Sequence, residues 1–247
     1  IYHAHISGYG FLLPPQVPIL AVSRNTMGYW GSRSQNSLIY WLPNQLPATV
    51  VNCQIERDID ILVQSRKTSE YVINQLVPEL KKKFNGVVVD TFVDDLITLF
   101  NRTKIYLYDS AEYWVKYRLT EGFGLPPMEA LACGCQVFSS VNHALADYLD
   151  PGVNCHKIAG YATGHDVQRI SAVLENWQPS DLPDSFFSPY RSEQLIPRLE
   201  TMLVELNQFF DYRQQQPSDI SSLTRKRQLY LFYKRVQAKL AKLKAKG

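Results

Sequence analysis

The sequence lacks any apolar run long enough to cross a membrane as a helix. Such a helix needs about 20 consecutive, mostly apolar residues, and no stretch of the 247 residues approaches that length. The chain has no signal peptide, and it begins at Ile1 rather than Met, which suggests a fragment or a processed chain. Hydrophobic residues (45%) and charged residues (20%) occur in ordinary proportions. The sequence therefore predicts one large globular domain, or one domain with extensions.

Cysteine is scarce, and its spacing does not suggest a metal site. The four cysteines are Cys53, Cys133, Cys135 and Cys155. No second pair and no histidine stands at zinc spacing from Cys133 and Cys135. His3 and His5 form an H-x-H pair with no further ligand beside it. We expect small, buried thiols in a reducing compartment, and no bound metal.

Acidic residues are missing from the C-terminal end. Residues 225–246 contain nine of the 26 basic residues and no acid, which leaves 17 basic and 23 acidic residues and a charge of −6 elsewhere. An apolar stripe opposite the lysines consists of Leu229, Phe232, Tyr233, Val236, Leu240 and Leu243. Three interpretations stay open: a helix docked on a folded domain, an interfacial helix on anionic lipid, or a frayed chain end.

One dense motif, at 119–135, stands out in the middle of the chain. It reads L-T-E-G-F-G-L-P-P-M-E-A-L-A-C-G-C. Proline suits the first turn of a helix, because its missing N–H would be unpaired there, and glycine suits a helix end. The motif therefore predicts a loop that leads into a helix, beginning near Pro126 or Pro127 and ending at Gly134. A strand is expected at 105–108, before the loop.

The predicted loop has the chemistry of an anion site. Main-chain N–H groups at a helix start attract negative charge, and Gly122 and Gly124 would let a ligand approach the backbone. Glu129, expected in the first helical turn, would repel phosphate but could accept hydrogen bonds from sugar hydroxyls. The residues alone allow two interpretations: a nucleotide-sugar site, or an ordinary helix start with an acidic first turn.

The stretch from Glu121 to Gly134 resembles the E-x7-E signature of the family 4 retaining glycosyltransferases, which have the GT-B fold. The resemblance extends along roughly residues 58–160. It implies that Glu121 faces the transferred sugar and that Glu129 binds the ribose of the nucleotide. It also implies that the diphosphate and sugar are lined by Gly122, Phe123, Gly124 and Leu125.

A second candidate group follows the strand expected at 58–64. The turn between this strand and the following helix contains Ser65, Arg66 and Lys67. It lies at the sheet edge where ligands bind in open α/β folds. Arginine can fork onto phosphate oxygens, and lysine supplies a point charge. The resemblance implies that an Arg and a Lys from this loop neutralise the donor diphosphate without a metal. In the family these two are a few residues apart, whereas here they are adjacent, so surface charge is the alternative.

Strands and helices alternate between residues 58 and 177. Strands are expected at 58–64, 86–91, 103–108, 136–140 and 154–158, and helices at 69–84, 93–100, 126–133, 143–149 and 164–177. Val87 to Val89 are expected to be fully buried, and 111–120 to be an aromatic loop. This alternation predicts an α/β fold, a Rossmann-like parallel sheet with helices on both faces, as in the C-terminal half of a GT-B fold, plus C-terminal helices.

The flanking segments complete three predicted units. Residues 1–45, with strands at 18–23 and 37–42, resemble the remnant of an N-terminal acceptor domain and its junction. Residues 46–178 form the nucleotide-sugar-binding domain. Residues 179–247 comprise a linker (178–192), a helix at 193–210 and the basic amphipathic tail.

The resemblance implies a cytoplasmic, hexosyltransferase-type enzyme that moves a sugar from a nucleotide-diphosphate sugar, with UDP-sugar as the expected donor. Its acceptor would be a glycan or a lipid-linked molecule, and no cofactor or nucleic acid is expected. The catalytic candidates are Glu121, Arg66 and Lys67; the donor-binding candidates are Glu129, Gly122, Phe123, Gly124, Leu125 and Ser65. An alternative is an isolated nucleotide-sugar-binding half without turnover. An oxidoreductase is disfavoured, because no G-x-G-x-x-G follows the 58–64 strand.

Overall fold

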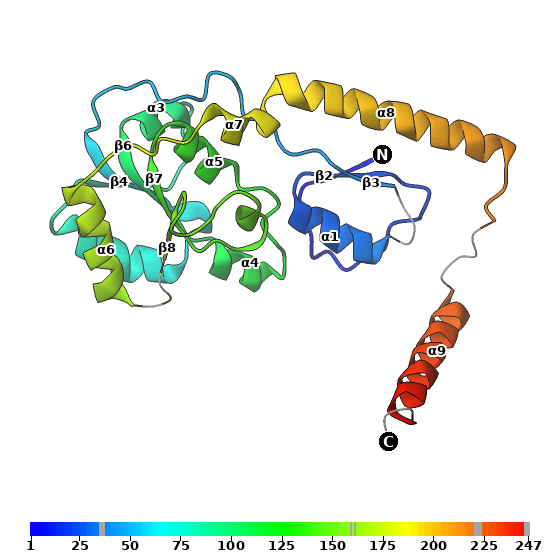
Figure 1. The fold of residues 1–247 in the computed structure, drawn as a ribbon. Helices are drawn as coiled ribbons and strands as arrows, with labels where there is room; N and C mark the ends of the chain where they lie inside the picture. The colour runs from blue at the N-terminus through cyan, green and yellow to red at the C-terminus, as the bar shows by residue number, and fades with distance from the viewer. Residues whose placement is uncertain (35–37, 159, 161, 220–223, 245–247) are drawn as a thin grey trace.

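The computed structural model describes residues 1–34, 38–158, 160, 162–219 and 224–244. They form a larger and a smaller parallel sheet, a long helix that runs beside the smaller sheet, and a separate C-terminal helix (Figure 1). Among the described helices, none combines the length and hydropathy that crossing a bilayer would require.

The larger sheet confirms the predicted α/β class. Its strands are β4 (Ile59–Gln64), β5 (Gly86–Val89), β6 (Thr103–Tyr108), β7 (Gln136–Ser139) and β8 (His156–Lys157). They are all parallel, in the order β5-β4-β6-β7-β8. In the register, Ile61 lies opposite Ile105, and Ile105 opposite Gln136.

Helices cover both faces of this sheet, as predicted. Along β6, Tyr106 joins one buried cluster while Ile105 and Leu107 join another, because successive strand residues point to opposite faces. The first cluster includes residues of α3 (Leu96–Asn101) and α5 (Leu125–Ala132), and the second residues of α2 (Val77–Lys81) and α6 (Thr163–Glu175).

The helix after Ser69 contains a local irregularity with a chemical cause. Ser69 caps it, because the Val72 N–H donates to Ser69 Oγ at 3.2 Å. Residues Val72–Leu76 then form a π-helical turn, closed by the Val77 N–H donating to the Val72 carbonyl. Pro78 follows directly and has no N–H to donate to the preceding turn. The π-turn therefore lies where the ordinary hydrogen-bond ladder is interrupted.

Two predictions about local structure are wrong, and tertiary packing explains both. Val87 to Val89 are half-buried rather than fully buried, because β5 lies at the edge of the sheet. Most of 111–120 is not a loop but helix α4 (Ala111–Tyr117), with Glu112 in its first turn. The helix ends at Arg118, which adopts the left-handed conformation (φ 54°).

The smaller sheet consists of β1 (Tyr2–Ala4), β2 (Ile19–Ala21) and β3 (Ile39–Trp41), all parallel. Helix α1 (Arg24–Arg33) follows β2 and is capped by Ser23, since the Thr26 N–H donates to Ser23 Oγ at 3.0 Å. Ser37, the first residue of the strand predicted at 37–42, lies outside the described residues. The division at residues 45 and 178 stays a prediction.

The segment expected as a linker packs onto the larger domain instead. Residues 178–192 contain α7 (Asp184–Phe187) and a 3-10 turn (Ser188–Tyr190), and their buried aromatic side chains belong to the main core cluster. Hydrophobic burial outweighs the Pro- and Ser-rich composition here.

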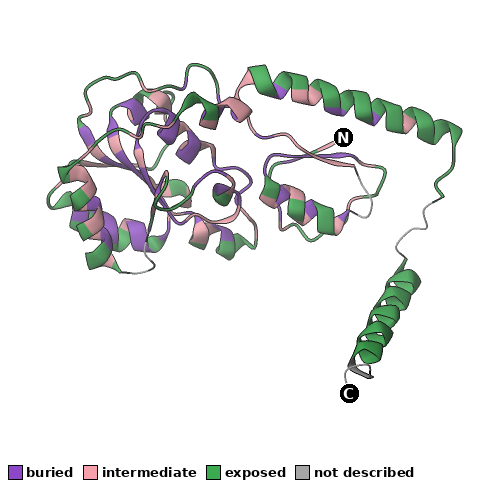
Figure 2. Cartoon of the chain, viewed as in Figure 1, coloured by how far each residue is buried: buried purple, intermediate pink, exposed green. Residues whose placement is uncertain are grey.

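Two long helices end the chain. Helix α8 (Ser192–Gln215) runs five residues beyond its predicted end, and α9 (Arg225–Lys244) stands apart from the body (Figure 1). Figure 2 shows α9 exposed from Arg225 to Lys242, in contrast to the buried strands. The Trp41 ring links α8 to the smaller sheet, because the guanidinium of Arg198 lies 4.4 Å from its centroid and that of Arg24 lies 4.5 Å away.

A pair of phenylalanines tests whether residues 178–192 belong to the core. Phe187 is 8% exposed and Phe92 is 88% exposed. Phe187→Ala should lower the free energy of unfolding by about 3–5 kcal/mol, whereas Phe92→Ala should change it by no more than about 0.5 kcal/mol. Denaturant titration measures both, and equal effects would contradict the core assignment.

Candidate functional site

The candidate site lies at the carboxyl edge of the larger sheet, where three strands end side by side. A 3-10 turn (Ser65–Lys67) follows β4, Ser110 lies beyond β6, and Asn142 lies beyond β7. The loop with Glu121 and the start of α5 belong to the same edge. Ligands in open parallel α/β folds bind at such an edge.

Glu121 is the centre of a buried hydrogen-bond network. Its side chain is 5% exposed, and its Oε2 accepts hydrogen bonds from the Tyr108 hydroxyl at 2.6 Å and Trp114 Nε1 at 2.9 Å. Ser110 Oγ is a third donor, at 3.2 Å. Burial and the nearby Glu121 charge raise the pKa of Tyr108 well above its ordinary value, so the phenol keeps its proton and donates.

Lys67 reaches the same carboxylate from the β4 turn. Its Nζ lies 3.7 Å from Glu121 Oε1 and 4.6 Å from the centroid of the Trp114 ring. A lysine over an indole face gains from the negative charge of that face. The structure thus brings together two predicted site residues, and the bridging Trp114 comes from the helix that sequence reasoning took for a loop.

Ser65 and Arg66 make fewer contacts with the site than Lys67 does. Ser65 begins the 3-10 turn and is half-buried, while Arg66 is exposed. In the described part of the chain, the Arg66 side chain has no hydrogen bond or ion pair with protein. Arg66 therefore has no charged partner in the described chain, and of these two adjacent cations only Lys67 contacts the Glu121 carboxylate.

The loop offers a run of unpaired main-chain donors. Helix α5 begins at Leu125, and its N-cap Gly124 contributes no side-chain hydrogen bond. The N–H groups of Gly122, Phe123, Gly124 and Leu125 donate to no acceptor among the described residues. Unpaired N–H groups at a helix start, together with the helix dipole, favour anions.

The two glycines serve protein packing as well as backbone access. A Cβ on Gly122 would lie 1.4 Å from the His5 carbonyl oxygen. A Cβ on Gly124, where φ is +84°, would lie 2.4 Å from Leu145 Cδ2 and 2.9 Å from the Tyr148 hydroxyl. On these sides the space is filled by protein, so the expectation that the missing side chains leave room for a ligand needs correction. Any ligand must approach the main chain from elsewhere.

The side chains of Phe123 and Leu125, like the two glycines, contribute to protein packing. The Phe123 side chain is buried against the rings of Tyr148 and Tyr190, with both centroid distances 5.6 Å, while Leu125 is half-buried at the helix start. Phe123 can therefore face a ligand only with its backbone.

Glu129 lies in the second turn of α5, not the first as predicted, because the helix begins at Leu125. Its carboxylate is half-buried, and burial raises its pKa above the ordinary value. No hydrogen bond or ion pair to the Glu129 side chain occurs within the described chain. A desolvated carboxylate without donors is unfavourable, so this side chain is suited to accepting hydrogen bonds from a ligand.

Sequence reasoning missed His143 and Asn142. His143 Nδ1 accepts the Glu121 N–H at 3.3 Å and lies 3.0 Å from Asn142 Nδ2. Burial lowers the pKa of His143, although the Glu121 charge opposes this; the ring is therefore neutral near pH 7, with Nδ1 free to accept. Both residues follow the strand predicted at 136–140, and that position was the signal that could have found them.

The same loop is conformationally strained. Val141 has φ +47° and His143 has φ +53°. Positive φ is a rare conformation for a β-branched residue, and strain of this kind is found preferentially at functional sites. The strained backbone lies directly beside the Glu121 network, which supports this edge as the functional one.

The smaller sheet touches this loop directly. Thr120 donates its N–H to the Ser7 carbonyl at 3.0 Å, and Arg24 donates its N–H to Asp147 Oδ2 at 2.6 Å. The histidine pair of the N-terminal segment lies nearby in the chain, with ring centroids of His3 and His5 4.2 Å apart. The Glu121 loop is therefore covered on one side by residues 5–7.

Metal chemistry has little support in this part of the molecule. No group of three or more His, Cys, Asp or Glu side chains in the described residues could hold an ion. Cys133, Cys135 and Cys155 are buried free thiols, as expected, but Cys53 is exposed. Burial raises the pKa of Cys133 and of Cys135 to about 12, so both remain protonated thiols.

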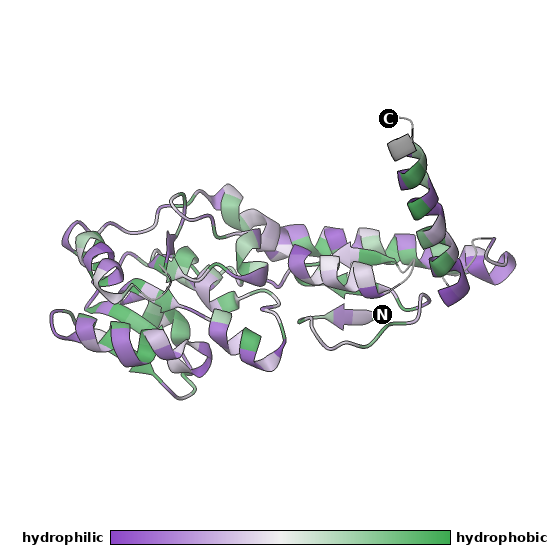
Figure 3. Cartoon of the chain, turned by 90° about the horizontal axis from the view of Figure 1, so that it is seen from below, coloured by the Kyte–Doolittle hydropathy of each residue, from purple (hydrophilic) through white to green (hydrophobic). Residues whose placement is uncertain are grey.

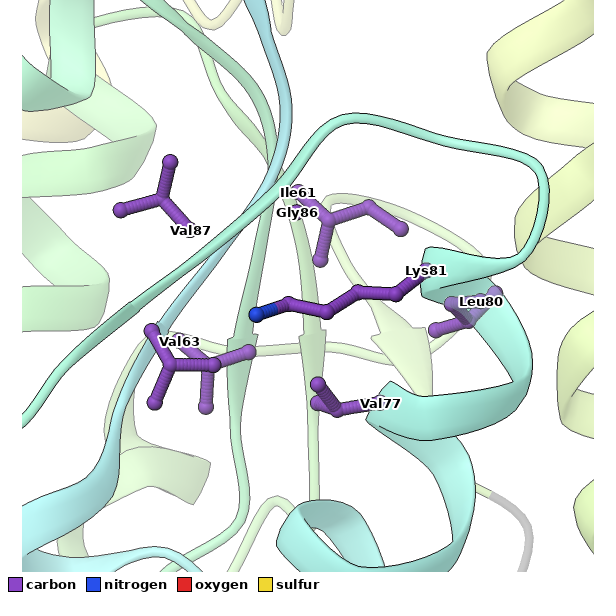
Figure 4. A pocket seen from close by; sticks show the side chains of 8 residues that line it. Ile61, Val63, Val77, Leu80, Lys81, Gly86 and Val87 are labelled. Carbon is purple, nitrogen blue, oxygen red and sulfur yellow. The ribbon is translucent and has the colours of Figure 1, made fainter.

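An apolar crevice between α2 and the β4–β5 edge is not the site. Figure 4 shows the Lys81 side chain stretched across it, toward β4 and β5. The crevice leaves no room for a water molecule. Its lining consists of Ile61, Val63, Val77, Leu80, Lys81, Gly86, Val87 and Val88. It lacks both an acid and free space, so it is a packing defect beside the first strand residues of β5.

The fold and the site define a structural class. It is a parallel α/β domain with unpaired N–H groups at a helix start and two acids at the carboxyl edge of its sheet. Residues 78–183 match the family described as glycosyl transferases group 1. This match, which covers less than half of the chain, confirms the predicted resemblance to the family 4 glycosyltransferases.

Known proteins agree with this assignment over different lengths. The serotype-specific mannosyltransferase WbdA of Escherichia coli is 36% identical over 95 residues, which cover 37% of this chain and 9% of WbdA. The pneumococcal O-GlcNAc transferase GtfA, solved with UDP and GlcNAc, matches with a TM-score of 0.55 at 12% identity. That match covers 76% of this chain and 45% of GtfA.

HepE of Anabaena, solved with UDP-glucose, matches with a TM-score of 0.50 at 12% identity over 79% of this chain and 64% of HepE. At such identities the structural matches show the fold alone, which is GT-B-like. The chain spans less than two thirds of the length of each of these proteins.

Two glycines with nearly the same backbone test the packing of the loop. Gly124 and Gly152 have φ values of +84° and +86°, but a Cβ on Gly152 would meet nothing within 4 Å. Gly152→Ala should lower the free energy of unfolding by about 1–2 kcal/mol through backbone strain alone. Gly124→Ala should lower it by about 1–3 kcal/mol more, through overpacking against Leu145 and Tyr148. Equal losses in urea denaturation would contradict the close contacts at Gly124.

The raised pKa of Glu129 predicts a pH dependence of stability. The folded chain holds this proton more tightly than the unfolded chain, so unfolding releases it between the ordinary pKa of 4.5 and the raised value. The free energy of unfolding should therefore fall as pH rises through this window, and Glu129→Gln should lack this loss. The exposed Glu200→Gln is the control and should keep the wild-type pH profile; parallel profiles for wild type and Glu129→Gln would refute the assignment.

Proposed function

We propose that this chain contains the donor-binding part of a retaining glycosyltransferase, which moves a sugar from a nucleotide-diphosphate sugar to a glycan or a lipid-linked acceptor. The observation that carries the proposal is the segment between the two acids. Four unpaired N–H groups at residues 122–125 lie between Glu121, buried beside Lys67, and Glu129, which has no donor of its own among the described residues. Phosphate oxygens and sugar hydroxyls supply the groups that this arrangement lacks.

Negative charge gathers on the nucleoside diphosphate as the bond to the sugar breaks. In the proposal, the N–H groups of 122–125 and the side chains of Arg66 and Lys67 stabilise this charge where it develops. Arg66 is exposed and has no protein partner in the described chain, which leaves its guanidinium available for a phosphate. Ser65, at the start of the same turn, adds a hydroxyl donor.

The two carboxylates take different parts. Oε2 of Glu121 is occupied by three protein donors, so only Oε1, which faces Lys67, can accept from a sugar hydroxyl. Glu121 therefore holds Lys67 in place and orients the sugar at one point. Glu129, desolvated by burial, accepts the hydroxyls of the ribose.

The donor is proposed to be a hexose on UDP. Similar proteins support this choice: one is a mannosyltransferase, and two solved structures contain UDP, with GlcNAc in one case and as UDP-glucose in the other. UDP-, GDP- and ADP-hexoses, titrated in parallel by calorimetry, would identify the base.

Substitutions in the proposed diphosphate and ribose contacts should weaken donor binding. Arg66→Met, Lys67→Met and Glu129→Gln should each raise the Kd at least about tenfold, or about 1.4 kcal/mol, because each removes a charged hydrogen-bond partner. Lys83→Met, at an exposed end of the helix after Ser69, is the matched control and should leave the Kd unchanged. Melting curves should show that all three site variants are folded. Unchanged donor affinity in all of them would then contradict the proposal. Binding without transfer or hydrolysis would favour a binding half that lacks turnover.

A further inference from the structure

Helix α9 presents a whole apolar face to solvent. Leu229, Phe232, Tyr233 and Leu240 are 69, 65, 58 and 53% exposed, and Val236 is 38% exposed. Their spacing of three, one, three and four residues places them on one side of a helix. Figure 3 shows hydrophobic and hydrophilic residues alternating along α9, outside the packed body. An apolar face of this kind is a site for a partner.

The rest of the α9 surface carries charge of a single sign. Arg225–Lys244 contains eight basic residues and no acid. At about 100° per residue, Lys234 falls on the side opposite the apolar face, while Lys226 and Arg235 flank it. The basic residues are Arg225, Lys226, Arg227, Lys234, Arg235, Lys239, Lys242 and Lys244. The partner must therefore offer both an apolar phase and negative charge.

This charge pattern decides between the candidate partners. A second copy of α9 would bring eight like charges against eight, which opposes pairing through this face. Nucleic acid would satisfy the lysines but offers nothing to Leu229, Val236 and Leu240. An anionic bilayer satisfies both halves: apolar side chains enter the headgroup boundary, and Lys and Arg stay at the anionic headgroups. Tyr233, with an apolar ring and a polar hydroxyl, suits that boundary.

We propose that α9 lies flat on a membrane surface rich in anionic lipid and attaches the chain to it. The apolar face of Leu229, Phe232, Tyr233, Val236 and Leu240 enters the interface, and the basic residues contact the headgroups. The helix does not cross the bilayer, in agreement with its eight charges. This inference is independent of the proposed donor site, which lies at the edge of the larger sheet that contacts the N-terminal segment.

Vesicle binding of the intact chain tests the proposal. Wild type should co-sediment with vesicles containing 30% phosphatidylglycerol in phosphatidylcholine, and at least tenfold less with pure phosphatidylcholine. Binding should weaken as salt rises from about 0.1 M to about 1 M, because the Debye length falls from about 10 Å to about 3 Å. Equal binding to both vesicle types, or no binding to either, would overturn the proposal.

Matched variants separate the two halves of the mechanism. Lys234→Gln/Lys239→Gln/Lys242→Gln should bind anionic vesicles at least tenfold less than wild type. The control Lys81→Gln/Lys82→Gln/Lys83→Gln removes the same charge from the body and should bind like wild type. Phe232→Ser/Leu240→Ser keeps every charge and should also bind at least tenfold less; unchanged binding would reduce the contact to electrostatics and refute the interfacial helix.

Two further measurements test whether the apolar face is covered by a second copy of the chain or by the chain's own body. Sedimentation equilibrium without lipid should give the monomer mass for wild type and for Phe232→Ser/Leu240→Ser. A dimer that only the serine variant loses would assign the face to a second copy. Protection of α9 from hydrogen exchange without lipid would assign it to the chain's own body. Donor affinity should be the same in all tail variants, so failed lipid binding and a failed donor site are distinguishable.

Discussion

The buried carboxylate of Glu121 organises the carboxyl edge of the larger sheet. It accepts hydrogen bonds from Tyr108 at the end of β6, from Ser110 two residues later and from α4, and it faces the ammonium of Lys67 from the β4 turn. A carboxylate buried this deeply would be unstable without such partners. Three separate segments are therefore fixed relative to one another by a single side chain, and the start of α5 follows directly from their arrangement.

Close contacts hold the N-terminal segment of the smaller sheet against the Glu121 loop and restrict its position. The His5 carbonyl lies where the side chain of residue 122 would be, and Thr120 pairs with Ser7 just before the acid. Glu121 is thus flanked by the N-terminal segment on one side and by the strained Val141–His143 loop on the other. The geometry of the edge depends on both sheets, although its chemical groups come almost entirely from the larger one.

Local chemistry made much of the fold predictable. Ser23 and Ser69 cap their helices, and Gly134 ends α5 in the left-handed conformation (φ 82°), because each choice is decided within a few residues. Helix α4 and the exposure of β5 were not predictable in this way, since packing partners distant in sequence decide them. The same holds for the site. Glu121 and Glu129 could be named from the motif, and Lys67 from its position after a predicted strand, but the roles of Trp114 and His143 exist only once the strands are side by side. The space beside Gly122 and Gly124 was misjudged because its occupants lie 117 and 21 residues away, at His5 and Leu145.

Trp114 is connected to the edge in two ways at once: its indole N–H donates to Glu121, and its ring lies under the Lys67 ammonium. The emission energy of an indole depends on the electric field along its long axis, and the Lys67 ammonium, 4.6 Å from the ring centroid, contributes to that field. Any anion that draws the ammonium away alters this field without touching the tryptophan. Trp114 is therefore an intrinsic fluorescence probe of this edge, because its emission wavelength depends on the position of Lys67.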